Sequence, residues 1–156
     1  MGDGNSCISC TEQDLSPIST KLDSGAKKLE AAIKRAAQKL GAYKKDAATK
    51  KYITKTLAEV HRLQITNWTL SWVFPRKLTI CNNEAICSFT SYQSTADDYR
   101  IHNEEMRQFG LAIIKKLKKL GKTQATLAAQ LLKPIEAQFK VNLAESYVVP
   151  IKDFHC

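Results

Sequence analysis

Hydrophobic side chains recur at steps of three and four residues along the first third of the chain, which is the spacing of one helix face. Ser16-Pro17 precedes this run, with a hydroxyl suited to capping and a proline at the first helical position, and Gly41 is a plausible end. The pattern therefore predicts an amphipathic helix from Ser16 to about Gly41. Its apolar stripe consists of Ile18, Leu22, Ala26, Leu29, Ile33, Ala36, Leu40 and Tyr43.

A second helix is predicted after Asp46, which is a suitable capping residue. Its apolar positions are less regular, and they comprise Tyr52, Ile53, Leu57, Val60, Gln64 and Trp68. Because few residues separate the two segments, they are expected to form an antiparallel helical hairpin.

The period changes at Trp68. Hydrophobic residues at positions 68, 70, 72 and 74 alternate with others, and Pro75 follows, so residues 68–74 are predicted to be a strand. Residues 78–81 and 86–92 are predicted as two further strands around Asn82-Asn83-Glu84, which gives a β insert at about 68–92. The main alternative is a longer second helix that reaches Phe74.

Helical spacing returns after Ser94 and Thr95 and continues to Gly121. Thr123 then begins a last helix, which Pro134 is expected to kink or divide. The inward positions of the third helix are Tyr99, His102, Met106, Phe109, Ile113, Leu117 and Leu120. Those of the last helix are Leu127, Leu131, Ile135, Phe139, Asn142 and Leu143.

These segments predict a mainly α fold: a four-helix bundle of two antiparallel helix hairpins, joined by a short disulfide-stapled β-hairpin element. The expected organisation is an extended N-terminal arm at 1–15, one helical domain at 16–147 with the β insert, and an extended tail at 148–156. A chain of 156 residues is long enough to bury a single core without a metal ion.

The cysteines lie near both termini and in one central segment, as expected for bonds that tie loose ends to a core in an oxidising compartment. Cys81 and Cys87 would face each other across the predicted hairpin. A second bond would join Cys156 to Cys10 or Cys7, leaving one thiol free or intermolecular, so a monomer or a disulfide-linked dimer is expected. The rival interpretation is a zinc site built on Cys7 and Cys10 with Cys81, Cys87 or His155.

Charge provides the clearest candidate site. Lys and Arg together number 24 against 15 Asp and Glu, a formal net charge of +9, which favours acidic partners. The densest cluster ends the third helix, and it consists of Lys115, Lys116, Lys118, Lys119 and Lys122. Its simplest interpretation is a solvated helix end; its functional interpretation is contact with an acidic glycan or protein. The arginines are scattered, which argues against specific nucleic-acid binding.

No catalytic motif is present, and His102 falls on an apolar stripe as a core residue would, so an enzyme is not expected. No metal site or cofactor is assigned, and no segment is long and apolar enough to span a membrane.

The sequence thus predicts a small, basic, secreted recognition protein, ligand-like or effector-like, that binds a receptor protein or an acidic glycan through lysine-rich helix faces. Two alternatives stay open. One is a carrier that holds a lipid or another apolar small molecule inside the bundle. The other is a cationic membrane-active protein that uses Ile113, Ile114, Leu117 and Leu120 as its apolar face.

Overall fold

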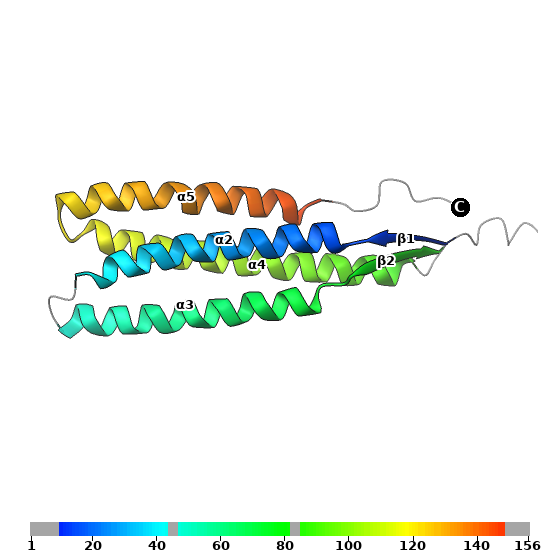
Figure 1. Ribbon diagram of the computed structural model, residues 1–156, viewed down its shortest axis with the longest axis horizontal. Helices are drawn as coiled ribbons and strands as arrows, with labels where there is room; N and C mark the ends of the chain where they lie inside the picture. Colours follow the sequence, from blue (N-terminus) through cyan, green and yellow to red (C-terminus); the bar gives the residue numbers. More distant parts are fainter. Residues whose placement is uncertain (1–9, 44–46, 82–84, 149–156) are drawn as a thin grey trace, which may run out of the picture.

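The computed structural model describes residues 10–43, 47–81 and 85–148. Within these residues the order of elements is β1 (Cys10–Asp14), α2 (Ser16–Gly41), α3 (Ala47–Val73), β2 (Lys77–Cys81), α4 (Ala85–Lys118) and α5 (Lys122–Ser146). The four helices run alternately up and down along one long axis, and the two strands extend from one end (Figure 1). We call this the sheet end, and we call the opposite end, where α2 leads to α3 and α4 leads to α5, the loop end.

The centre of the molecule is formed by α2 and α4. Each of them packs against both α3 and α5, and α4 also contacts β2. The two outer helices lie on opposite sides of this central pair (Figure 1). The molecule is therefore mainly helical, and α3 leaves one long side directed away from the other helices.

The apolar stripe predicted for α2 is confirmed. Its buried members include Leu22, Leu29 and Leu40, and Ile18 and Tyr43 pack partly buried at its two ends. The predicted hydroxyl cap is not used; instead the backbone N–H of Ser16 donates to Asp14 Oδ1 at 2.9 Å. This hydrogen bond lowers the pKa of the Asp14 carboxyl.

The strand predicted at 68–74 is wrong, because α3 continues to Val73, as the alternative of a longer second helix anticipated. Threonine and serine favour strands in general, but here their hydroxyls donate back to the helix: Thr69 Oγ1 to the carbonyl of Ile65 at 2.9 Å, and Ser71 Oγ to that of Trp68 at 2.6 Å. The predicted core face of α3 is also partly wrong, since Leu57 and Trp68 are exposed whereas Thr56, Leu63, Asn67 and Leu70 are buried.

The strand predicted at 78–81 is confirmed as β2, but its partner is different. It pairs antiparallel with β1, with Cys10 opposite Cys81 and Asp14 opposite Lys77. The third predicted strand, 86–92, lies in α4. The β-hairpin insert is therefore a wrong prediction: the N-terminal arm, distant in sequence, supplies the neighbouring strand.

The absence of the predicted β-hairpin removes the reason for expecting a bond between Cys81 and Cys87. The hairpin that was to oppose Cys81 and Cys87 is replaced by the start of a helix. Cys7 and Cys156 lie outside the described residues, as do the side chains of Cys10, Cys81 and Cys87, so both predicted bonds remain untested.

The last helix runs without interruption through Pro134 from Lys122 to Ser146, so the expected division does not occur. Inward-facing Asn142 is confirmed as buried, whereas Leu143 is partly exposed. Asn142 belongs to a polar layer in the core: its Nδ2 donates to the Gly25 carbonyl at 3.0 Å and to Asn103 Oδ1 at 2.7 Å. These bonds join α2, α4 and α5 at one level of the bundle.

Candidate binding surfaces

The lysine cluster singled out in the sequence lies at the loop end. Lys115, Lys116 and Lys118 occupy the last turn of α4, Lys119 follows it, and Lys122 begins α5. All five side chains are exposed. Their positive charge lies beside the partial negative charge of the α4 C-terminus, so part of the cluster stabilises the helix end.

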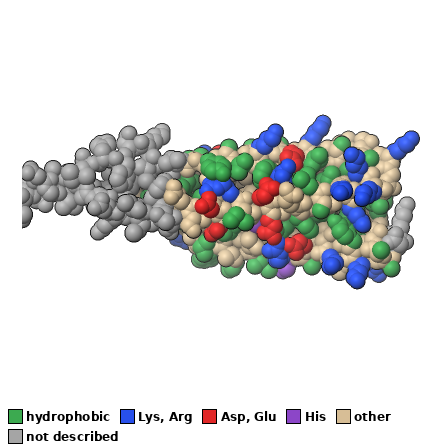
Figure 2. Space-filling model, turned by 180° about the vertical axis from the view of Figure 1, so that it is seen from behind, with side chains coloured by type: hydrophobic (Ala, Val, Ile, Leu, Met, Phe, Trp, Pro, Cys, Tyr) green, Lys and Arg blue, Asp and Glu red, His purple; other side chains and the backbone are tan. Residues whose placement is uncertain are grey.

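The fold adds basic residues from the other helices to this cluster. We define the basic end as all the exposed cations of the described segments 31–43, 47–58 and 108–135, which contain no Asp or Glu. Its members are Lys34, Arg35, Lys39, Lys50, Lys51, Lys55, Lys115, Lys116, Lys118, Lys119, Lys122 and Lys133. The space-filling view shows Lys and Arg gathered toward the loop end, whereas Asp and Glu lie nearer the middle and the sheet end (Figure 2).

Sequence reasoning found only the α4–α5 part of this surface. Apart from Lys133 in α5, the other members lie in the two separate segments 31–43 and 47–58, and only the up-and-down topology places those segments at the same end. The available signal was the absence of acidic residues from each of these segments, rather than any dense run of lysines.

The cations of the basic end are free of carboxylate partners among the described residues. The ion pairs lie elsewhere: Lys27 with Asp23, Lys77 with Glu12, Arg62 with Glu59 and Glu105, Arg100 with Asp97, and Arg107 with Glu104 and Glu136. Within the basic end, Lys116 Nζ lies 4.9 Å from the centre of the Tyr52 ring, a cation–π contact between α4 and α3. The charge is therefore available to an external anion.

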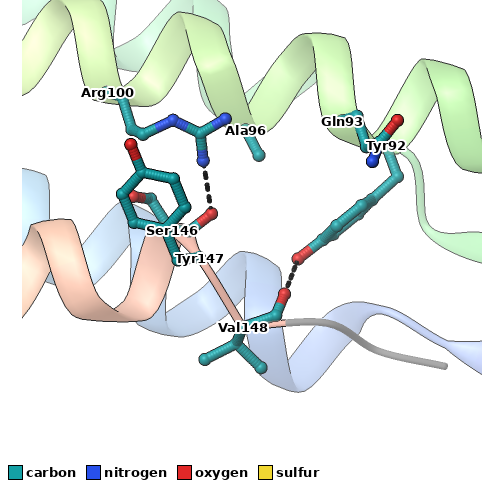
Figure 3. Close-up of a pocket in the computed structure, with 7 residues that line it drawn as sticks. All are labelled: Tyr92, Gln93, Ala96, Arg100, Ser146, Tyr147 and Val148. Atoms are coloured by element: carbon teal, nitrogen blue, oxygen red, sulfur yellow. Dashed lines mark hydrogen bonds between the residues drawn. The ribbon is translucent and has the colours of Figure 1, made fainter. Parts of the chain in front are cut away.

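A second surface feature lies between α4 and α5 near the sheet end. A cavity of about 120 Å³ is lined by Tyr92, Ala96, Arg100, Ser146 and Tyr147, among others (Figure 3). Two of its polar side chains already have partners: the Tyr92 hydroxyl donates to the carbonyl of Val148 at 2.6 Å, and Arg100 Nη1 donates to that of Ser146, also at 2.6 Å. The Arg100 guanidinium also lies 4.3 Å from the centre of the Tyr147 ring.

An open groove of about 520 Å³ adjoins this cavity and shares Arg100 and Tyr147 with it. The groove is lined also by Ile101, Phe139 and Leu143. Arg100, its central cation, is engaged with Asp97, Ser146 and Tyr147. We interpret the cavity and the groove as parts of the packing interface between α4 and the C-terminal end of α5, rather than as ligand sites.

The residues proposed for a membrane-inserted face are mostly part of the core. Ile113, Ile114 and Leu117 are buried, and only Leu120 is partly exposed. Insertion would require the C-terminal part of α4 to leave the bundle, with the loss of its apolar burial. Among the described residues, no helix is both long enough and apolar enough to cross a membrane.

His102, which the sequence predicted to be a core residue, is buried as expected. Both of its ring nitrogens lack a hydrogen-bond partner among the described residues, and burial lowers its pKa to about 4. Burial, with a smaller contribution from Asp23, raises the pKa of neighbouring Tyr99. The described part of the chain holds no group of three or more His, Cys, Asp or Glu positioned to bind a metal ion.

Comparison with known proteins adds no relative: no protein-family model, no curated protein and no solved structure matches the chain.

Proposed function

We propose that the protein is a secreted recognition protein that binds an acidic glycan through the basic end. The observation that supports this function is the set of exposed cations, contributed by all four helices and unpaired among the described residues, in segments without a carboxylate. Such a surface attracts polyanions through counterion release, and its affinity falls steeply with salt.

The arrangement of the lysines favours a glycan over a protein receptor. Specific protein interfaces have an apolar centre depleted in charged residues, surrounded by a polar rim. At the basic end, cations are contributed by all four helices and are not confined to the rim of one apolar patch. A flexible linear polyanion can follow such a surface from helix to helix.

Substitution of Lys115, Lys116, Lys118 and Lys119 together by glutamine should weaken heparin binding at physiological salt by about tenfold or more. The reason is that several contacts between lysine ammonium groups and heparin sulfate groups are lost at once. Heparin-affinity elution and titration over a salt series measure this effect. The matched control replaces Lys21, Lys28, Arg76 and Lys140 by glutamine, since these cations are exposed and lie outside the basic end. Both variants change the net charge equally, so equal elution of the two would refute a localised site.

The β1–β2 ladder places Cys10 opposite Cys81, an arrangement that suits a disulfide bond and hence an oxidising compartment. The N–H of Leu15 donates to the carbonyl of Arg76 at 2.9 Å, which makes these residues a hydrogen-bonded pair of the β1–β2 ladder. Such pairs alternate with non-hydrogen-bonded ones, so Cys10 opposite Cys81, five steps away, is a non-hydrogen-bonded pair. Facing Cα atoms are then about 4.5 Å apart, within the range that a disulfide bond requires.

We therefore propose a Cys10–Cys81 disulfide in protein recovered from an oxidising compartment, in place of the Cys81–Cys87 and Cys10–Cys156 bonds expected from the sequence. Peptide mapping without reductant should yield one fragment that joins the two strands. Cys10→Ser should release Cys81 for alkylation. A fragment joining Cys81 to Cys87, or five alkylatable thiols, would contradict this pairing.

A further inference from the structure

The outward side of α3 carries an apolar stripe that nothing covers among the described residues. Leu57 is 47% exposed, Ile65 52%, Trp68 63% and Trp72 65%. The spacing of three and four residues places them on one side of the helix together with His61 and, two turns before Leu57, Lys50. We call Lys50, Leu57, His61, Ile65, Trp68 and Trp72 the outer stripe.

The outer stripe is distinct from the face of α3 that packs in the core. The buried residues of α3 include Ile53, Val60, Leu63 and Leu70. α3 also forms one edge of the molecule, with α2 and α4 on its inner side (Figure 1). The two tryptophan rings pack edge to face with their centroids 5.9 Å apart, which makes them one continuous aromatic surface.

The spacing of residues along the outer stripe is symmetric about His61. Leu57 lies four residues before His61 and Ile65 four after it, and Lys50 and Trp72 each lie eleven residues away. If a second copy of α3 lies antiparallel across the stripe, His61 falls on the two-fold axis. Leu57 then meets Ile65 of the second copy, and Lys50 meets Trp72 of the second copy. This is the self-complementary pattern that a two-fold interface requires.

The chemistry of the paired positions is compatible. Two aliphatic side chains meet on each side of the axis, and at each end an ammonium group meets the face of an indole, the strongest partner for a cation–π contact. Thr54 falls opposite Trp68 in the same register, and its hydroxyl is already satisfied by the carbonyl of Lys50 at 3.1 Å. No position places two cations or an unpaired buried carboxylate in contact.

The charge distribution of the whole molecule favours the same orientation. Antiparallel copies set the basic end of one molecule beside the part of the other that contains all the described Asp and Glu residues. Parallel copies would place two basic ends together. Complementary potentials of this kind select orientation and speed association.

We propose that the outer stripe of α3 is the interface of an antiparallel homodimer. The exposed parts of the two tryptophans contribute roughly 300 Å² per copy, and the stripe as a whole buries roughly 1,000 Å² in total, at the low end for specific association. The dimer is weak, in the micromolar range. It covers Lys50 of each basic end and leaves the other members of the two basic ends free at opposite ends of the assembly. It is independent of the proposed function and of any intermolecular disulfide.

Sedimentation velocity over a concentration series, with reductant present, tests this proposal. Wild-type protein should shift from monomer to dimer, and Trp72→Lys should raise the dimer dissociation constant at least about 100-fold, since an ammonium then faces Lys50 of the second copy at both ends. Adding Lys50→Glu to that variant should restore association through two new ion pairs. Val141→Lys, at a 54% exposed position on α5, is the matched control and should behave as wild type.

Three results would overturn the proposal: a monomer at every concentration, an equal effect of the Trp72 and Val141 variants, or failure of Lys50→Glu to restore association to a Trp72→Lys variant whose circular dichroism is native. A tryptophan-dependent co-sedimentation with anionic vesicles, by a protein that is monomeric in solution, would assign the outer stripe to a membrane surface instead.

Discussion

Gly25→Ala is expected to lower the free energy of unfolding by about 2–4 kcal/mol, although the same change in a helix interior ordinarily stabilises by about 1 kcal/mol. Gly25 is buried in α2. A Cβ added there would lie 2.2 Å from Asn142 Oδ1 and 3.0 Å from its Cγ, so the amide of Asn142 would have to move.

Movement of that amide breaks a connected set of hydrogen bonds. Asn142 Nδ2 donates to the Gly25 carbonyl and to Asn103 Oδ1, and Asn142 Oδ1 accepts from Gln138 Nε2 at 2.8 Å. Asn103 Nδ2 in turn donates to the carbonyl of Tyr99 at 2.7 Å. Because Asn103 and Asn142 are buried, each group left without a partner costs about 1–3 kcal/mol.

Urea unfolding of Gly25→Ala, Asn142→Ala and the double variant measures this coupling as a double-mutant cycle. In the Asn142→Ala background, Gly25→Ala should be neutral or stabilising, because the three heavy atoms nearest to the new methyl group all belong to the Asn142 amide. Gly41→Ala is the matched control, since its Cβ meets only Ile53 Cγ2 at 4.0 Å. Equal destabilisation by Gly25→Ala in both backgrounds would show that the Asn142 clash is not the cause.

The sequence predicted best those helices whose apolar stripe contains few polar residues. In α2, Leu22, Leu29 and Leu40 follow a single 3.6-residue period, and burial matches it. In α3 the pattern failed, since this helix has two apolar stripes: a core face interrupted by Thr56 and Asn67, and an outer stripe with the larger side chains. The predicted stripe therefore included Leu57 and Trp68, which belong to the outer stripe, and it missed Leu63 and Leu70 of the core face.

The error around residues 68–92 has a related cause. Alternating tryptophans with threonine and serine between them satisfy the strand pattern, but the same residues extend α3 to Val73. Pairing could not be read locally either, because β2 takes its partner from Cys10–Asp14, before the first helix. A neighbour distant in the chain leaves no signal in the residues next to β2.

The candidate site was only partly predictable for the same physical reason. Lys115 to Lys122 form a dense run, and they were found directly. The contributions of α2 and α3 depend on which helix ends meet, and this is a property of topology. The polar layer around Asn142 was also missed, because its recognition requires Gly25 and Asn103 to lie at the same level as Asn142.

Acid is expected to destabilise the protein through His102, by about 3 kcal/mol between roughly pH 6.5 and pH 4. His102 is 2% exposed, and burial lowers its pKa to about 4 from the usual 6.5. Of the two charged groups that act on it, Glu105 raises the pKa of His102 and Arg62 lowers it, and both contributions are smaller than that of burial. The folded protein therefore keeps the ring neutral in a range where the unfolded chain takes up a proton.

This difference in proton binding decides whether acid stabilises or destabilises the protein. Because the unfolded state binds the additional proton, the free energy of unfolding falls as the pH drops from 6.5 toward 4 and changes no further, through this group, below that. His102→Met removes the titration and two ring nitrogens that lack partners among the described residues, so it should stabilise the protein at pH 7 and flatten the pH profile.

Urea unfolding at a series of pH values, reported as the difference between wild type and variant, isolates this contribution from the carboxylates. His61→Gln is the matched control when all proteins are measured at concentrations well below the micromolar range, where they are monomeric, because His61 is then exposed on α3 and its replacement should leave the wild-type slope in place. If His102→Met keeps that slope, or if His61→Gln removes it, the acid sensitivity of the protein does not originate from the buried imidazole.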